Sequence, residues 1–295
     1  MPESQNVKPL ALLALQALAR LPLRCIHQLG ALLGWVAYLT SRRYATRLRE
    51  NLAQSHLYSD RKSYSRLLRQ SVSEAGKAAA EVLAVWLRPQ RHVVDLVRDC
   101  QGWKLVDAAL ARGKGVILVS PHLGCFELTG QFVATRVDLT FLYSPPKIGW
   151  LAPLMLAGRQ RGAARGVAAG IGGVKSMLKS LRRGGVIGIL PDQVPSGGDG
   201  VWADFFGRPA YTMTLIGRLQ QSTGASVILI FAERLPKGNG YRIQLRPLEV
   251  PAGSDKTQIA ERLNKAIEDL IRLAPAQYLW SYNRYKVPSG APLPP

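Results

Sequence analysis

The stretch from Gly115 to Glu127 reads GVILVSPHLGCFE, and it predicts the architecture of the chain around it. It begins with a run of aliphatic and β-branched residues that ends at Val119, where Ser120 and Pro121 break the pattern. A short apolar run bounded in this way is typical of a strand buried in a parallel sheet. His122 follows at once, so the strand brings a histidine to the loop at its carboxyl end, where open α/β sheets carry their chemistry.

Helix-like and strand-like segments alternate along the rest of the chain. Further strands are predicted at 139–143, 185–190, 226–232 and 241–245, with a hairpin turn at 236–240, and helices at 60–87, 103–112, 127–135, 150–161, 171–183, 212–222 and 256–273. This alternation predicts an α/β fold with a mostly parallel central sheet flanked by helices.

A mostly apolar segment, residues 9–40, precedes the α/β pattern. Its longest apolar part, Cys25 to Leu39, is shorter than the ~20 residues that cross a bilayer as a helix. Trp35 and Tyr38 lie beside a cluster of four arginines within residues 42–49, as interfacial anchors do. These features favour two hydrophobic helices that insert into the membrane or lie against it.

We therefore expect residues 1–41 to form membrane-anchoring hydrophobic helices and residues 42–295 to form the α/β domain. By the positive-inside rule, the arginine cluster places the α/β domain in the cytoplasm. The alternative for the apolar segment is a pair of core helices in a soluble α/β protein.

The composition is strongly basic, with a formal net charge of +20 and a pI near 10.4. Such a surface binds polyanions, and composition alone leaves three classes open: nucleic acid, anionic lipid or an acidic carrier protein. The three cysteines are scattered, without a CxxC pair or the spacing of a metal site. They favour a reducing compartment over a disulfide framework, and we expect no metal or cofactor site.

His122 and Glu127 are the first candidates for chemistry, because histidine exchanges protons near neutral pH. Residues five apart do not share a helix face, so the two meet only if His122 lies in the loop and Glu127 in the first turns of the helix. Glu127 would then accept a hydrogen bond from one ring nitrogen while the other faces substrate. The alternative is a helix-capping histidine near an exposed glutamate.

Cys125 lies between His122 and Glu127. It is either a nucleophile or a small apolar residue in the first helical turn.

A basic region spans residues 140–191, which contain no Asp or Glu. Basic residues beside a sheet can hold phosphates or an acidic partner, and Arg159, in a glycine-rich context, is the strongest candidate. Asp192 directly follows the predicted strand at 185–190, so it enters the same crevice as His122. There it orients Arg159 or polarises a substrate hydroxyl, or it only forms a turn. The basic residues are Lys147, Arg159, Arg161, Arg165, Lys175, Lys179, Arg182 and Arg183.

The segment GGDGVWADFFGRPAYT, residues 197–212, is expected to form a loop that carries Trp202, Phe205, Phe206 and Tyr211. Exposed aromatic residues on a glycine-rich loop favour an apolar wall for an acyl chain. Ordinary core packing is the alternative.

Six segments, in their order and spacing, resemble the lipid A biosynthesis acyltransferases, late lauroyl and myristoyl transferases within the lysophospholipid acyltransferase superfamily. They are SPHLGCFEL at 120–128, GRQR at 158–161, LPDQ at 190–193, FFGRPAYT at 205–212, TGASVILIFAER at 223–234 and LWSYNRYK at 279–286. The resemblance covers nearly the whole chain, including the apolar N-terminus. The chain departs from the family pattern at Cys125 and Phe126, where the family usually reads Asn-Trp.

The resemblance implies an enzyme of the bacterial inner membrane whose catalytic domain faces the cytoplasm. It implies transfer of a fatty acyl group from acyl carrier protein to a hydroxyl of a Kdo-bearing lipid A precursor, which is an anionic glycolipid. His122 is then the general base and Glu127 the acid that orients it, while Arg159 and Asp192 match the second and third blocks of the superfamily.

Arg161 and Gln193 adjoin these blocks and complete the expected substrate-binding residues, Arg159, Arg161, Asp192 and Gln193.

The alternative enzyme is a related membrane acyltransferase that acts on a lysophospholipid or another glycolipid. A different class is a non-catalytic basic protein that binds nucleic acid or membrane. The sequence carries no nucleic-acid-binding motif, so we expect no nucleic acid partner.

Overall fold

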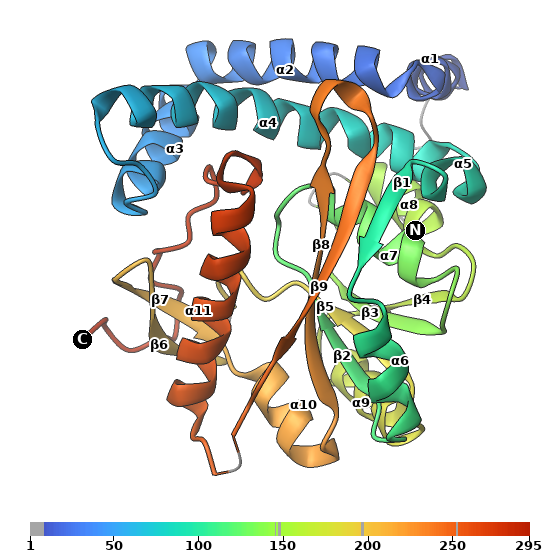
Figure 1. The fold of residues 1–295 in the computed structure, drawn as a ribbon, viewed down its shortest axis with the longest axis vertical. Helices are drawn as coiled ribbons and strands as arrows, with labels where there is room; N and C mark the ends of the chain where they lie inside the picture. Colours follow the sequence, from blue (N-terminus) through green and yellow to red (C-terminus); the bar gives the residue numbers. More distant parts are fainter. Residues whose placement is uncertain (1–8, 145, 147–148, 196–197, 252) are drawn as a thin grey trace.

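The computed structural model describes residues 9–144, 146, 149–195, 198–251 and 253–295. Its centre is a seven-stranded sheet with the order β1-β9-β8-β2-β5-β3-β4 (Figure 1). The strands are β1 (Val97–Gln101), β2 (Val116–Val119), β3 (Leu139–Tyr143), β4 (Ala164–Ala168), β5 (Val186–Ile189), β8 (Ser226–Arg234) and β9 (Tyr241–Leu248). Neighbours pair in parallel except β8 and β9, which form the expected antiparallel hairpin. The predicted α/β fold with a mostly parallel sheet is therefore confirmed.

Helices cover both faces of this sheet. They are α5 (Gln90–Val94), α6 (Lys104–Ala111), α7 (Phe126–Val133), α8 (Leu151–Arg159), α9 (Ile171–Arg182), α10 (Leu215–Thr223) and α11 (Lys256–Leu273). β2 lies in the middle of the sheet, between β8 and β5, and each of its residues is buried. Burial on both faces explains why its sequence is an unbroken apolar run.

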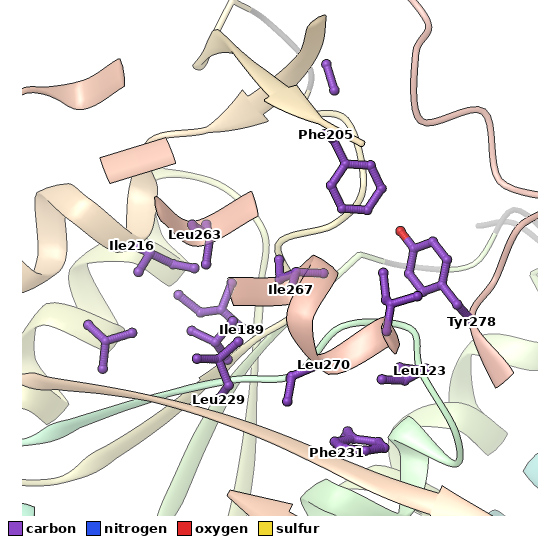
Figure 2. Packing of buried hydrophobic residues seen from close by; sticks show 14 of the residues in the cluster. Leu123, Ile189, Phe205, Ile216, Leu229, Phe231, Leu263, Ile267, Leu270 and Tyr278 are labelled. Carbon is purple, nitrogen blue, oxygen red and sulfur yellow. The ribbon is translucent and has the colours of Figure 1, made fainter. Parts of the chain in front are cut away.

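Side chains that alternate along the strands build a separate core on each face of the sheet. The first core joins the sheet to α11 and is drawn in Figure 2; it includes Ile189, Leu229, Ile267 and Leu270. The second core joins the sheet to α7; it includes Leu118, Leu128, Phe132 and Ile230.

Four N-terminal helices precede the sheet: α1 (Pro9–Arg20), α2 (Leu23–Thr40), α3 (Arg42–Gln54) and α4 (Arg61–Leu87). α2 and α4 lie side by side across the top of Figure 1. Their backbones touch, because a Cβ atom added at Gly76 would lie 2.0 Å from the carbonyl oxygen of Gly30 and 2.7 Å from the Cα of Gly34. Only glycines allow so close an approach.

The apolar N-terminal segment is helical, as predicted, but its relation to a membrane stays a prediction. Among the described residues, none of the helices combines the length and the apolar character that a bilayer crossing requires. α2 buries one side against α4 and exposes a stripe of apolar side chains on the other. These side chains are 45% to 76% exposed and belong to Leu29, Leu32, Leu33, Val36 and Leu39.

The structure also contains strands that the sequence pattern does not predict. β1 and β4 lie at the two edges of the sheet, where half-exposed positions break the apolar pattern. β6 (Gly200–Phe205) and β7 (Arg208–Met213) form a separate antiparallel hairpin where a loop is expected. The predicted helix at 212–222 therefore begins later, at Leu215.

The aromatic residues of this hairpin pack into the protein interior. Phe205 and Tyr211 are each 1% exposed, and Phe206 is 8% exposed. Figure 2 shows Phe205 above Ile267 of α11, near Tyr278. The expectation of an exposed aromatic loop is wrong, because β6 pairs with β7 and Phe205 and Phe206 pack in the core that includes α11. Tyr211 is buried as well, so the core-packing alternative is confirmed for these three residues.

Candidate active site

His122 and Asp192 lie at the carboxyl ends of two adjacent parallel strands. β2 ends at Val119 and β5 ends at Ile189, and these two residues are paired in the sheet. In both segments the chain leaves the strand through a proline and then presents a polar residue. Because the strands end side by side, the two side chains meet in the crevice at this edge of the sheet.

The Asp192 carboxylate holds His122 at two points. The ring Nδ1 of His122 donates to Asp192 Oδ1 at 2.8 Å, and the backbone N–H of His122 donates to Asp192 Oδ2 at 2.9 Å. Since an ionised carboxylate only accepts, we assign the ring proton to Nδ1. Nε2 then keeps its lone pair, and the side-chain amide nitrogen of Gln193 lies 3.2 Å from it. A histidine base oriented by a buried acid is the arrangement found in hydrolase triads.

The charge of Asp192 is maintained by its neighbours. Burial alone would raise the pKa of Asp192, but the charge of His122 and the hydrogen bonds from its ring and backbone outweigh burial and lower that pKa below its ordinary value. The Tyr278 hydroxyl also lies against this carboxylate. Burial, and then the charge of Asp192, raise the pKa of Tyr278 well above its ordinary value, so its proton is retained and available to Asp192.

Glu127 lies in the first turn of α7, as predicted, but its carboxylate is hydrogen-bonded to residues other than His122. Arg159 donates to both of its oxygens, with Nε at 2.9 Å from Oε2, and Trp86 Nε1 donates to Oε2 at 2.9 Å. The predicted hydrogen bond from His122 to Glu127 is therefore wrong. Asp192 takes that place, and Glu127, not Asp192, orients Arg159.

Arg159 carries a permanent positive charge and lines the same cavity as His122. Burial would lower the pKa of Arg159, but the hydrogen bonds and charge of Glu127 outweigh burial and raise it. Its guanidinium carbon lies 5.7 Å from the centre of the Trp86 ring, within cation–π range. About a quarter of the side chain remains exposed (26%), so this cation is open to a ligand.

Arg161 has a different position from the one expected. Its guanidinium donates to the backbone carbonyls of Val85, Trp86 and Arg88, which are free because α4 ends there. This placement makes Arg161 a cap for α4 and does not fit the predicted contact with substrate. Lys147, in the same basic region, lies outside the described residues.

Cys125 does not have the environment of a nucleophile. The side chain is 2% exposed, and its backbone N–H donates to the carbonyl of Ala232 at 2.9 Å. Burial, reinforced by the charge of Glu81, raises the pKa of the Cys125 thiol well above its ordinary value, so the reactive thiolate is disfavoured. The alternative of a small apolar residue in the first turn of α7 is the one that fits.

One cavity of about 880 Å³ connects the site residues. His122, Glu127, Arg159 and Gln193 line it, together with many apolar side chains from the sheet, α7 and α10. The four aromatic residues of the β6–β7 hairpin are not among its described lining, so the expected apolar wall is supplied by other elements. In the described part of the chain, no group of three His, Cys, Asp or Glu residues is placed to hold a metal ion.

Sequence reasoning missed three contributors to this site: Trp86, Tyr278 and Arg284. Trp86 comes from the end of α4, and the other two come from the C-terminal segment, whose residue 278 pairs with Leu123 in an isolated bridge. The only signal for Tyr278 and Arg284 was their place in or beside the LWSYNRYK segment, which implied importance without a role.

Comparisons with known proteins identify the family of this chain. Residues 5–287 match the model of the bacterial lipid A biosynthesis acyltransferase family. A lipid A biosynthesis lauroyltransferase of Escherichia coli (strain K12) is 26% identical over 279 residues, which are 92% of this chain and 89% of that protein. A lipid A biosynthesis palmitoleoyltransferase of the same strain is 25% identical over 271 residues, 90% of this chain and 87% of that protein. A lipid A biosynthesis acyltransferase of Haemophilus influenzae is 25% identical over 276 residues, with 92% and 85% covered.

Proposed function

The chain belongs to the bacterial lipid A biosynthesis acyltransferases, and on this premise we propose that it transfers a fatty acyl group from acyl carrier protein to a hydroxyl of a Kdo-bearing lipid A precursor. The observation that carries the proposal is a histidine at the edge of a largely apolar cavity, with an unprotonated Nε2 that has only the Gln193 amide beside it among the described residues. A base beside a space for hydrocarbon is what transfer of an acyl chain to a hydroxyl requires.

The reaction is a direct transfer between the two bound substrates. His122 Nε2 takes the proton of the acceptor hydroxyl as its oxygen attacks the thioester carbonyl, and Asp192 stabilises the imidazolium that forms. When the C–S bond breaks, the imidazolium returns the proton to the departing thiolate. An ester and a free carrier thiol result, and no group of the enzyme is consumed.

Arg159 is the group that we assign to the negative charge on the carbonyl oxygen in the transition state. It is cationic, faces the cavity and is fixed by Glu127, so little reorganisation accompanies the reaction. The backbone N–H groups of Leu123, Gly124 and Cys125 already donate to carbonyls of Pro121, Gln277 and Ala232. Glu127 therefore contributes through Arg159 and not through His122.

The membrane and the carrier protein are the partners that fit the surface. The apolar stripe of α2 provides a face for the lipid bilayer, and the arginines of α3 lie next to it in the chain. We assign the enzyme to the inner membrane with its catalytic domain on the cytoplasmic side. The net charge of +20 suits both the phosphates of the acceptor and the acidic surface of acyl carrier protein.

The test uses full-length enzyme in detergent, lauroyl or myristoyl acyl carrier protein and a Kdo-bearing lipid A precursor, with mass spectrometry of the product. Wild-type enzyme should add one acyl chain to the precursor. His122→Asn should lower kcat by about 10²–10⁴, the usual contribution of a general base. His92→Asn, which changes an exposed histidine of α5, is the matched control and should retain wild-type turnover.

Full activity in His122→Asn would contradict the assignment of the base. Efficient transfer to a lysophospholipid, with none to the lipid A precursor, would contradict the acceptor and favour the related membrane acyltransferase.

A further inference from the structure

The cavity extends beyond the catalytic residues along buried apolar side chains, and we call this part its inner branch. Several residues that line the cavity are themselves deeply buried, so the cavity reaches from the crevice at His122 into the interior between α7 and the sheet. These residues are Leu118, Val133, Leu139, Met155 and Ile230, and each is 1% to 5% exposed. A space of this kind is walled by hydrocarbon and excludes polar ligands.

Two glycines create this inner branch. Gly188 lies in β5, in a row of the sheet whose other members are Ile228, Leu118 and Phe141, so a large apolar side chain is the expected occupant of its position. Gly130 lies in the middle of α7, where glycine weakens a helix relative to alanine. Both line the cavity.

Backbone conformation does not explain either glycine. Neither residue has a positive φ angle, and neither backbone is in close contact with another. A Cβ atom added at Gly130 would meet only Leu139 Cδ2, at 4.0 Å, and one added at Gly188 would meet Leu139 Cδ1 at 3.4 Å and Phe141 Cβ at 3.7 Å. The missing side chains therefore leave open space, with the two methyl groups of Leu139 between them.

We propose that this inner branch holds the acyl chain of the donor thioester and that Gly130, Gly188 and Leu139 together set the length of the chain that is transferred. The inference rests on the proposed function and deepens it by naming the residues that select the substrate. A chain that fills a branch walled by buried residues enters with its methyl end first and leaves its carbonyl carbon at the mouth, beside His122. The acceptor chain stays attached to a lipid whose other chains lie in the membrane, so the donor is the occupant.

The proposal predicts that substitutions that narrow the branch and one that widens it have opposite effects on the preferred acyl chain length. Gly130→Ala and Gly188→Ala add a methyl group to the space, so the longest chain that the wild-type enzyme accepts should lose about tenfold or more in kcat/KM, while shorter chains are unaffected. Leu139→Ala removes methyl groups, so the preference should move to a longer chain. Gly172→Ala is the matched control, because Gly172 lies on α9 with nothing within 4 Å of an added Cβ and does not line the cavity.

The experiment measures kcat/KM for full-length enzyme with decanoyl, lauroyl, myristoyl and palmitoyl acyl carrier protein and one fixed acceptor. Circular dichroism checks that each variant is folded; should Leu139→Ala fail to fold, the two glycine variants decide the question. A wild-type order of chain preference in folded Gly130→Ala and Gly188→Ala would overturn the proposal, as would the same change in Gly172→Ala. A wild-type enzyme that transfers no chain from any donor would overturn the proposed function instead.

Discussion

At the scale of single residues, His122 is held in one tautomer by groups from distant parts of the chain. Asp192 accepts from its Nδ1 and from its backbone N–H, and Leu279 donates its own N–H to the carbonyl of His122 at 3.1 Å. The Tyr278 hydroxyl in turn forms a hydrogen bond with the Asp192 carboxylate. The imidazole therefore has little freedom to rotate or to move its proton to Nε2, the atom that must be unprotonated in the proposed mechanism.

Replacing Asp192 tests this arrangement directly. In Asp192→Asn the amide can donate to Nδ1, so the ring proton moves to Nε2 and the base is lost. We expect kcat to fall by about 10²–10⁴ with a smaller change in KM, because orientation and tautomer are lost while the cavity remains. Asp204→Asn, at an exposed position of β6, is the control. Wild-type kcat in Asp192→Asn would contradict the role of Asp192.

The candidate residues could be identified from the sequence, but which of them form hydrogen bonds with each other could not. His122 and Asp192 could be predicted because each follows an apolar strand, and the ends of parallel strands meet at one edge of a sheet. The sequence places Glu127 close to His122, and local spacing favoured that pair. In the structure the Glu127 carboxylate instead accepts hydrogen bonds from Arg159 and Trp86, which belong to other helices. Such contacts depend on tertiary packing, which no local spacing encodes.

At the scale of elements, α4 connects the N-terminal helices with the sheet and the active site. Its residue Glu81 is 1% exposed and accepts from Arg234 of β8, His27 of α2 and Tyr241 of β9. One turn further on, Trp86 reaches Glu127 in α7. A single helix thus fixes the position of α2 and of the arginine partner of the site.

The buried ion pair of Glu81 gives stability a defined pH dependence. Burial would raise the pKa of Glu81, but the charge and hydrogen bonds of Arg234 and those of His27 lower it from 4.5 to about 2. Because the folded pKa is the lower one, the stabilisation is complete above pH 4.5 and is lost as the pH falls towards 2.

We therefore expect Glu81→Gln to lower the free energy of unfolding by about 3 kcal/mol at neutral pH, since it leaves the charge of Arg234 less compensated in the interior. The difference from wild type should shrink in acid, where Glu81 itself becomes neutral. Denaturant unfolding at neutral and acidic pH measures this, with Glu50→Gln on the exposed side of α3 as the control. A difference that stays constant down to the folded pKa of about 2 would contradict the ion-pair explanation.

Elements with strong periodicity were predicted well, and elements at edges were not. The long helix at 60–87 agrees closely with α4, because its apolar face recurs over many turns. β1 reads VRDCQ and β4 reads ARGVA, and neither shows the alternation or the apolar run of an interior strand. The β6–β7 hairpin was not predicted because its segment contains glycines and a proline, which on sequence alone indicate turns and loops.

At the scale of the whole molecule, the outward face of α2 and the overall charge act together. α2 lies on the side of α4 that faces away from the sheet (Figure 1), and the apolar stripe of α2 is exposed. On the proposed function, the acceptor is anchored in the same bilayer, so the enzyme and one substrate meet on a surface. The other substrate arrives from the aqueous side and is guided by charge.

Two charges placed in the stripe should release the enzyme from the membrane. Leucine burial is worth about 1.5–3 kcal/mol per side chain, so Leu32→Glu with Leu33→Glu should weaken binding to phosphatidylethanolamine and phosphatidylglycerol vesicles by about 100-fold or more. Activity on detergent-dispersed acceptor should persist, because the site is untouched. Leu273→Glu, at an exposed end of α11, is the control in a vesicle sedimentation assay. Unchanged sedimentation of the double variant would place the lipid contact elsewhere.

Binding of acyl carrier protein should depend steeply on salt. The enzyme carries +20 charges, and interactions between exposed charges are screened over about 10 Å at 0.1 M ionic strength. We expect KM for the acyl carrier protein substrate to rise several-fold between low and physiological salt while kcat changes little. A KM that does not respond to salt would argue against electrostatic docking of the carrier.

The glycine contact between α2 and α4 affects how a soluble form of this enzyme should be engineered. Deleting the apolar N-terminus would uncover the backbone of α4 at Gly76 and remove His27 from Glu81. Arg88, which donates to the backbone carbonyls of Ala19 and Leu21, would lose its partners as well. Polar substitutions along the outer stripe of α2 keep this packing intact, so redesigning that face is the sounder strategy than truncation.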